Sequence, residues 1–198
     1  HGLIYDKIMG EYGEEKARLY YESQKKALEE YQKLAAEEDD FVRCSSYVYT
    51  LQNRAAIEKE VKALERIGCK ADFCEKTELP FSTKGAVRID NQAKFHPLKF
   101  GYRLAAGLKI YENTKILAIQ KNTAITEGGT IRAKKIIVAT HFPFLNKYGA
   151  YFLKMYQHRS YVLALENANV PKGMYVDEAK DGLSFRSHGD VLLLGGGS

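Results

Sequence analysis

One short run of residues places the strictest demand on the fold of this chain. Residues 136–139 read Ile-Ile-Val-Ala, and Thr140 follows them. A continuous apolar, β-branched run is typical of a strand that has other elements packed on both of its faces. The run therefore predicts a buried strand over residues 135–140, parallel to its neighbours, and a layered structure around it.

The first third of the chain is predicted to form two helices with a strand between them. Residues 13–38 contain strong helix formers and no proline, with apolar residues at near-helical spacing, which predicts a helix. Residues 41–51 turn to β-branched and aromatic residues and predict a strand. Residues 53–67 predict a second amphipathic helix, with Gly68 as its C-cap.

Short strands dominate the remainder. Residues 71–89 predict strands joined by a turn near residues 80–85, and Pro97 begins a helix that Gly107 ends. Gly128-Gly129 predicts a hairpin. Further strands are expected over residues 109–120, 123–127, 130–132, 158–166, 174–177, 183–186 and 191–194. The fold class is therefore α+β, with helices and an antiparallel or mixed sheet.

Composition narrows the function classes. The chain has 198 residues, enough for one core or two small domains, and its +5 net charge comes from Lys and Arg interleaved with Glu. We expect a mixed solvated surface and no nucleic-acid partner. No apolar run approaches a membrane span and no signal peptide is recognisable, so a cytoplasmic location is expected. Cys44, Cys69 and Cys74 lack C-x-x-C spacing, which favours reduced thiols.

Several short motifs follow one another in a fixed order along the chain. Residues 97–106 begin with Pro and end in Leu-Ala-Ala, residues 114–119 read Thr-Lys-Ile-Leu-Ala-Ile, and residues 138–141 read Val-Ala-Thr-His. Residues 185–190 read Phe-Arg-Ser-His-Gly-Asp, and Leu-Leu-Leu-Gly-Gly-Gly closes the series at residues 192–197. In this order the motifs, with the Gly-Gly hairpin between them, resemble the D-amino-acid oxidase and glycine oxidase superfamily of FAD-dependent oxidoreductases over most of the chain.

The resemblance implies an organisation for the chain. Residues 1–92 and 148–198 would form a substrate-binding region, an antiparallel or mixed sheet with helices. Residues 93–147 would supply a partial strand system of a flavin-binding α/β domain. The subgroup that the chain resembles most has His-Gly-Leu-Ile-Tyr, as at residues 1–5, and sometimes carries an iron-sulfur domain far downstream.

The resemblance also implies a chemistry. Members oxidise a small amine or amino acid by hydride transfer to FAD, while the protein supplies positioning and electrostatics. This sequence lacks the G-x-G-x-x-G turn that holds the pyrophosphate. We therefore expect an internal fragment that works with flanking segments of a parent chain and by itself neither retains FAD nor catalyses. The amine, the electron acceptor and the oligomeric state stay open.

Six residues are candidates for contact with the flavin under this resemblance. The first two would lie near the flavin ring, and the strand residues would approach the adenine end. A loop, an expression-tag remnant, a plain buried strand or a structural histidine remain alternatives for them. The candidates are His1, Gly2, Ile116, Ala139, Thr140 and His141.

Arg186 is the leading candidate for substrate binding, because a planar guanidinium donates two hydrogen bonds to a carboxylate. A surface salt bridge is the alternative. Tyr161 and Tyr175 could line the same pocket, although packing is the default for either tyrosine. No catalytic side chain and no metal site is predicted. The rival function is a non-enzymatic interaction domain that uses the Tyr-rich strands and the charged helix.

Overall fold

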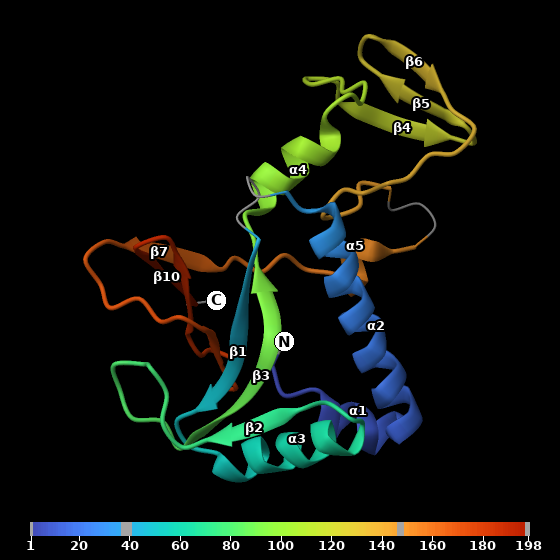
Figure 1. Cartoon of the computed structure of the whole chain (residues 1–198). Helices are drawn as coiled ribbons and strands as arrows, with labels where there is room; N and C mark the ends of the chain where they lie inside the picture. Colours follow the sequence, from blue (N-terminus) through green and yellow to red (C-terminus); the bar gives the residue numbers. More distant parts are fainter. Residues whose placement is uncertain (1, 37–40, 146–148, 197–198) are drawn as a thin grey trace. The chain divides into compact units, whose positions relative to one another are not determined.

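The computed structural model describes residues 2–36, 41–145 and 149–196 (Figure 1). The chain divides into two compact units. The larger unit contains His1–Leu104 and Ser160–Ser198, and the smaller unit contains Ala105–Arg159.

A seven-stranded mixed sheet forms the framework of the larger unit. Its strand order is β2-β3-β1-β8-β9-β10-β7. β1 runs parallel to β8, and the other neighbouring pairs are antiparallel. This arrangement confirms the predicted α+β class. The strands are β1 Val42–Thr50, β2 Ala71–Cys74, β3 Gly85–Lys94, β7 Tyr161–Leu165, β8 Met174–Asp177, β9 Ser184–His188 and β10 Val191–Gly196.

The helices of the larger unit are α1 Tyr5–Tyr12, α2 Glu14–Leu34, α3 Arg54–Arg66 and α4 Pro97–Ala105, the last of which ends at the boundary with the smaller unit. Gly13, with φ 85°, separates the first two, so the single helix predicted from residue 13 has a further helix before it. At α3 the Asn53 side chain accepts a hydrogen bond from the Ala56 N–H. The C-cap of that helix is Ile67, one residue before the predicted Gly68, which follows with φ 83°.

On one face of the sheet, α3 packs against β1, β2 and β3, and α1 contacts both α2 and α3. The register pairs Val87 with both Val48 and Phe73, so these side chains lie on the same face. Ile57 and Leu64 of α3 are almost fully buried against them. The buried members of this helix-side cluster are Tyr5, Ala17, Ile57, Val61, Ala63, Leu64, Ile67, Cys69, Ala71 and Val87.

The opposite face carries a smaller, aromatic cluster. Tyr47 stacks on Tyr175 with ring centroids 4.4 Å apart. Tyr175 pairs with Phe185 across β8 and β9, which places both side chains on this face. The buried members of this aromatic-side cluster are Tyr49, Leu79, Ala86, Tyr175, Phe185 and Leu192.

A buried carboxylate fixes the start of the first helix. Glu60 of α3 accepts hydrogen bonds from the backbone N–H groups of Ile4, Tyr5 and Asp6 at 2.9, 2.8 and 2.8 Å. The N-cap residue of α1, Ile4, offers no capping side chain. Glu60 therefore supplies from a distant helix the acceptor that helix N-termini need.

The smaller unit contains a three-stranded antiparallel sheet. Its strands are β4 Ile116–Gln120, β5 Thr123–Thr126 and β6 Gly129–Arg132, and α5 Tyr151–Lys154 follows. The predicted hairpin is present, with Gly129 as the first residue of β6. The strand predicted from residue 109 begins only at Ile116.

The predicted buried strand over residues 135–140 is wrong. These residues form no strand, and Ile137 is 88% exposed. A strand needs a ladder partner and covering layers, and no described strand pairs with this segment.

Among the described residues, no helix is long and apolar enough to cross a membrane.

Candidate functional site

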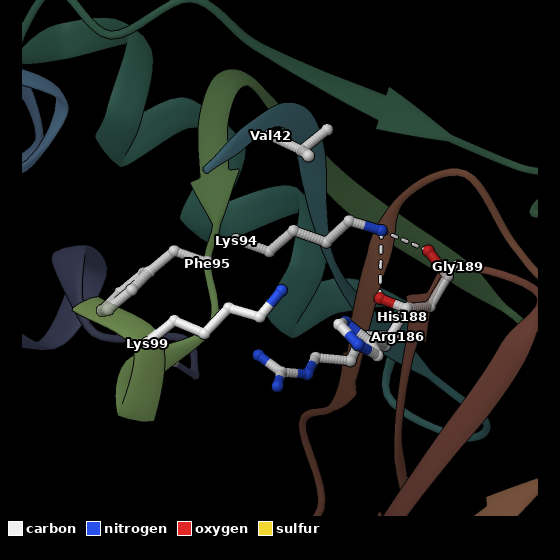
Figure 2. A pocket seen from close by; sticks show the side chains of 8 residues that line it. Val42, Lys94, Phe95, Lys99, Arg186, His188 and Gly189 are labelled. Carbon is white, nitrogen blue, oxygen red and sulfur yellow. Dashed lines mark hydrogen bonds between the residues drawn. The ribbon is translucent and has the colours of Figure 1, made fainter. Parts of the chain in front are cut away.

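A cavity of about 490 Å³ lies at one end of the large sheet. It is framed by the first residue of β1, the last residue of β3, the start of α4 and the end of β9 (Figure 2). All of its lining residues belong to the larger unit. They are Val42, Lys94, Phe95, Lys99, Arg186, Ser187, His188 and Gly189.

Strand alternation presents Arg186 to this cavity. In β9 the side chains of Phe185 and Ser187 are buried, whereas Arg186 and His188 are exposed. Successive residues of a strand point to opposite faces of a sheet. Phe185 packs in the aromatic-side cluster, so the side chain of the next residue, Arg186, points away from that cluster.

Lys94 bridges two strands that are not neighbours in the sheet. Its ammonium donates a hydrogen bond to the Ser187 carbonyl oxygen at 3.0 Å and another to the Ser187 hydroxyl oxygen. β8 pairs with β1 from Ser46 to Tyr49, so Val42, the first residue of β1, lies outside the paired stretch. The bridge thus holds the ends of β3 and β9 together where the β1–β8 ladder does not reach.

The cavity is strongly cationic. Lys94, Lys99 and Arg186 line it, and among the described residues no aspartate or glutamate does. Cys44 lies near Lys94, and burial raises the pKa of its thiol, although the positive charge of Lys94 acts in the opposite direction. The thiol therefore stays protonated near neutral pH and does not balance the positive charge.

Two histidine rings meet beside the cavity. His188 packs edge-on against His96 with ring centroids 5.6 Å apart. Across the described part of the chain, no group of three or more His, Cys, Asp or Glu residues could hold a metal ion.

The structure does not bring the two candidate tyrosines to Arg186. Tyr175 is 2% exposed, donates a hydrogen bond to Glu78 Oε2 at 3.4 Å, and lies on the opposite face of the sheet. Burial raises the pKa of its phenol above the usual range. Tyr161, 59% exposed, begins the edge strand β7. Neither tyrosine lines the Arg186 cavity.

The candidate flavin contacts are scattered. His1 lies outside the described residues, and Gly2 is exposed, with no atom within 4 Å of where a side chain would begin. In the smaller unit, Ile116 is half-buried in β4 and pairs with Thr126. Three further candidates are exposed and lie outside strands, namely Ala139, Thr140 and His141.

These residues do not fit a flavin by themselves. A dinucleotide site needs backbone N–H groups that converge on the pyrophosphate at a helix N-terminus. In the smaller unit the described cavity of about 700 Å³ is lined by residues between Gln120 and Arg132, and it contains none of the candidates.

Two cavity residues escaped sequence reasoning. Lys94 and Lys99 belong to no motif. They line the same cavity as Arg186 only because β3 and β9, which β1 and β8 separate in the sheet, both end at this cavity. The Pro97 helix start was a usable signal, since it places Lys99 in the first turn of α4. No local signal identifies Lys94.

Comparison with known proteins gives concordant results. The family model described as FAD dependent oxidoreductase matches residues 1–198. The Bacillus subtilis (strain 168) protein YhfW, named as a Rieske 2Fe-2S iron-sulfur protein, is 32% identical over 212 residues. That alignment covers 98% of this chain and 42% of the Bacillus protein.

Two solved structures share the fold. Glycine oxidase from Geobacillus kaustophilus superposes with a TM-score of 0.65 at 16% identity, covering 90% of this chain and 54% of that one. L-Proline dehydrogenase from P. horikoshii superposes with a TM-score of 0.64 at 11% identity, covering 86% of this chain and 53% of that one. At these identities the likeness concerns the fold alone.

The chain thus spans about half the length of the proteins that it matches, or less. The resemblance to the D-amino-acid oxidase and glycine oxidase superfamily is confirmed by the family match along the whole sequence and by the shared fold. The chain belongs to the FAD-dependent oxidoreductase family.

Proposed function

We propose that this chain is the substrate-side part of a longer FAD-dependent oxidoreductase that oxidises a small amine or amino acid. Arg186 is proposed to hold the substrate carboxylate. One observation carries this proposal: Arg186 lines a cavity whose charged side chains are all cationic.

The alternative role for Arg186, a surface salt bridge, has no support in the described contacts. Among the described residues no carboxylate forms an ion pair with Arg186, whereas Arg18, Arg54, Arg66 and Arg88 all have acidic partners. A guanidinium that faces a cavity has donors available for a bidentate carboxylate. Arg186 is therefore suited to ligand binding.

The contribution proposed for this chain is binding and orientation. Phe95 and Val42 give the cavity apolar surface, and the bridge from Lys94 to Ser187 holds β9 in place. When bound, the family's flavin supplies the redox chemistry. Holding the substrate in one orientation is what such a protein site adds to that chemistry.

The test uses the full-length protein loaded with FAD and an artificial electron acceptor. Replacing Arg186 with alanine is expected to raise KM for a carboxylate substrate roughly 10- to 100-fold, because a charge-assisted pair of hydrogen bonds is lost. An amine without a carboxylate is expected to keep its KM. Arg132→Ala, on exposed β6, is the matched control. An unchanged KM in Arg186→Ala would remove the assigned role.

Two further checks address the wider proposal. A G-x-G-x-x-G sequence is expected within about one βαβ unit upstream of His1 in the encoding gene. Purified residues 1–198 are expected to be colourless, whereas the full-length protein is yellow. Stoichiometric FAD on the short chain would contradict the placement of the pyrophosphate site outside it.

A further inference from the structure

His188 lies on the same face of β9 as Arg186. In that strand Phe185 and Ser187 are buried, whereas Arg186 and His188 are exposed and line the cavity (Figure 2). Residues two apart in a strand are separated by about 7 Å, so the two side chains leave the strand next to each other. This separation leaves room for a small α-amino acid that contacts both, with its carboxylate at Arg186 and its amino group at His188.

Oxidation of an amine requires a lone pair on its nitrogen. An aliphatic amine carries an extra proton at neutral pH, and the C=N bond of the imine product forms only after the nitrogen has lost that proton. The site of the proposed function therefore needs a group that accepts a proton from the bound substrate. Such a base must lie within hydrogen-bond reach of the proton, directly or through one water molecule.

Among the described residues that line the cavity, His188 is the one whose side chain is suited to this task. The protonated Lys and Arg side chains donate hydrogen bonds but accept none, and the apolar lining residues have no polar atom in their side chains. The hydroxyl of Ser187 is a weak base and already accepts a hydrogen bond from Lys94. A neutral imidazole, by contrast, has one ring nitrogen with a free lone pair.

A second histidine packs against the ring of His188. The ring of His96 meets it edge-on, with the centroids 5.6 Å apart. Nδ1 of His96 accepts a hydrogen bond from the backbone N–H of Lys99 at 3.3 Å, which ties His96 to the first turn of α4. His96 does not line the cavity. It therefore supports the ring of His188, and its own Nδ1 lone pair is already engaged.

The titratable and charged groups around His188 come from three elements and the segment between two of them. Arg186 is on its own strand, Lys94 comes from β3, Lys99 comes from α4, and His96 lies between β3 and α4. The described lining residues include no acidic side chain. Because His188 is exposed, water can reach its ring and carry a proton away.

We infer that His188 is the catalytic base of this site and that the substrate is an α-amino acid held between Arg186 and His188. The substrate ammonium gives one proton to the free ring nitrogen, so one N–H bond breaks on the substrate and one forms on the imidazole. The released lone pair forms the C=N bond as the Cα–H bond breaks, and this hydrogen leaves with both bonding electrons for the flavin. The product is a protonated imine, and the imidazolium returns its proton to water. The inference rests on the proposed function, because it assigns a step at the same site.

The first experiment measures binding to the full-length, FAD-loaded protein by calorimetry. The ligands are 2-aminoisobutyrate, which has an amino group but no Cα–H and so cannot be oxidised this way, and isobutyrate, which lacks the amino group. We expect 2-aminoisobutyrate to bind about tenfold more weakly at about pH 5.5 than at about pH 8, because an imidazolium cannot accept a hydrogen bond from the ammonium. Isobutyrate should bind as tightly or more tightly at the lower pH.

A variant assigns this pH dependence to its residue. His188→Gln keeps a hydrogen-bond acceptor but cannot take up a proton, so 2-aminoisobutyrate binding should lose its pH dependence while isobutyrate still binds. With glycine and both enantiomers of alanine and proline as substrates, kcat at neutral pH should fall roughly 100-fold. The loss should shrink at alkaline pH, where water removes the proton from the substrate. His158→Gln, exposed in the smaller unit, is the matched control and should change neither binding nor kcat.

The outcomes separate this inference from the proposed function. If amino acids are oxidised and Arg186→Ala raises KM, but His188→Gln keeps both kcat and the pH dependence of binding, the inference is overturned and the proposed function stands. If no amine or amino acid is oxidised, the proposed function is overturned, and the assigned proton transfer with it. Loss of isobutyrate binding in His188→Gln also overturns the inference, because His188 would then shape the cavity instead of acting as its base.

Discussion

The first and the last strands in the order of the seven-stranded sheet differ in what covers them, and we call these two sides the β2-β3-β1 end and the β7 end. At the β2-β3-β1 end, α3 packs on the strands, Ile57 is fully buried and Val87 almost so. At the β7 end all five residues are exposed, including Val162 and Leu163. Both ends are rich in apolar residues. The contrast shows that an apolar sequence allows a strand to be buried. Whether the strand is buried depends on the elements that pack against it.

The covered end owes its burial to complementary surfaces. α3 presents an apolar stripe at helical spacing, and the pairing of β3 with β1 and β2 aligns Val87 with Val48 and Phe73 beneath it. In the described residues β7 pairs only with β10, so it is an edge strand. An apolar edge strand is open to further pairing.

The largest effect is expected from a cavity made at the covered end. Ile57→Ala should lower the free energy of unfolding by about 3–4 kcal/mol, because it removes a side chain packed on all sides. Urea denaturation of the purified chain measures this value. A loss below about 1 kcal/mol would mean that the helix-side cluster contributes little to stability.

The buried carboxylate comes next. Glu60→Ala removes the acceptor for three backbone N–H groups and should cost about 2–3 kcal/mol in the same assay. Glu58→Ala is the matched control on α3, since Glu58 is exposed and pairs only at the surface with Arg54. That control should change stability by less than about 0.5 kcal/mol. Equal effects of the two variants would contradict the capping role of Glu60.

At the uncovered end a comparable truncation should have little effect. Leu163 is 59% exposed, so Leu163→Ala is expected to change the free energy of unfolding by less than about 0.5 kcal/mol. A loss that approaches the Ile57→Ala value would show that β7 is covered in solution, for example by a second copy of the chain.

The smallest effect concerns a surface carboxylate of the covered end. The Ser45 hydroxyl, which donates to Asp90 at 2.6 Å, and then Arg88 hold the pKa of Asp90 below its usual value. A lowered pKa stabilises the fold above the unfolded-state pKa near 4, and the contribution disappears as pH falls through the folded-state pKa. NMR titration should give a higher Asp90 pKa in Ser45→Ala. An unchanged pKa would exclude the Ser45 contribution.

Local patterns predicted the elements whose signals are local. β1, α3 and the Gly68 terminus follow from side-chain periodicity and from the conformational freedom of glycine. The run at residues 136–139 misled because the burial of a strand depends on layers that no local pattern specifies. The sequence therefore predicted the fold class and most elements, but not which apolar runs are covered.

The site was predictable only in part. Arg186 could be singled out because carboxylate recognition favours its side chain. Lys94 could not, because its contact with Ser187 joins positions far apart in the sequence, and that contact depends on the strand order. Tyr175 follows the packing alternative, since its aromatic ring stacks on Tyr47 and lies on the same face of the sheet as Phe185.

The parallel pairing of β1 with β8 has a consequence for how the molecule assembles. Its two strands lie on either side of the whole smaller unit in the sequence, Ala105–Arg159. On a ribosome, β1 emerges long before its partner, and closing so long a loop costs chain entropy. The helix-covered strands can associate first, so the joining of β8, β9 and β10 to β1 is expected to be the late and slow event of folding.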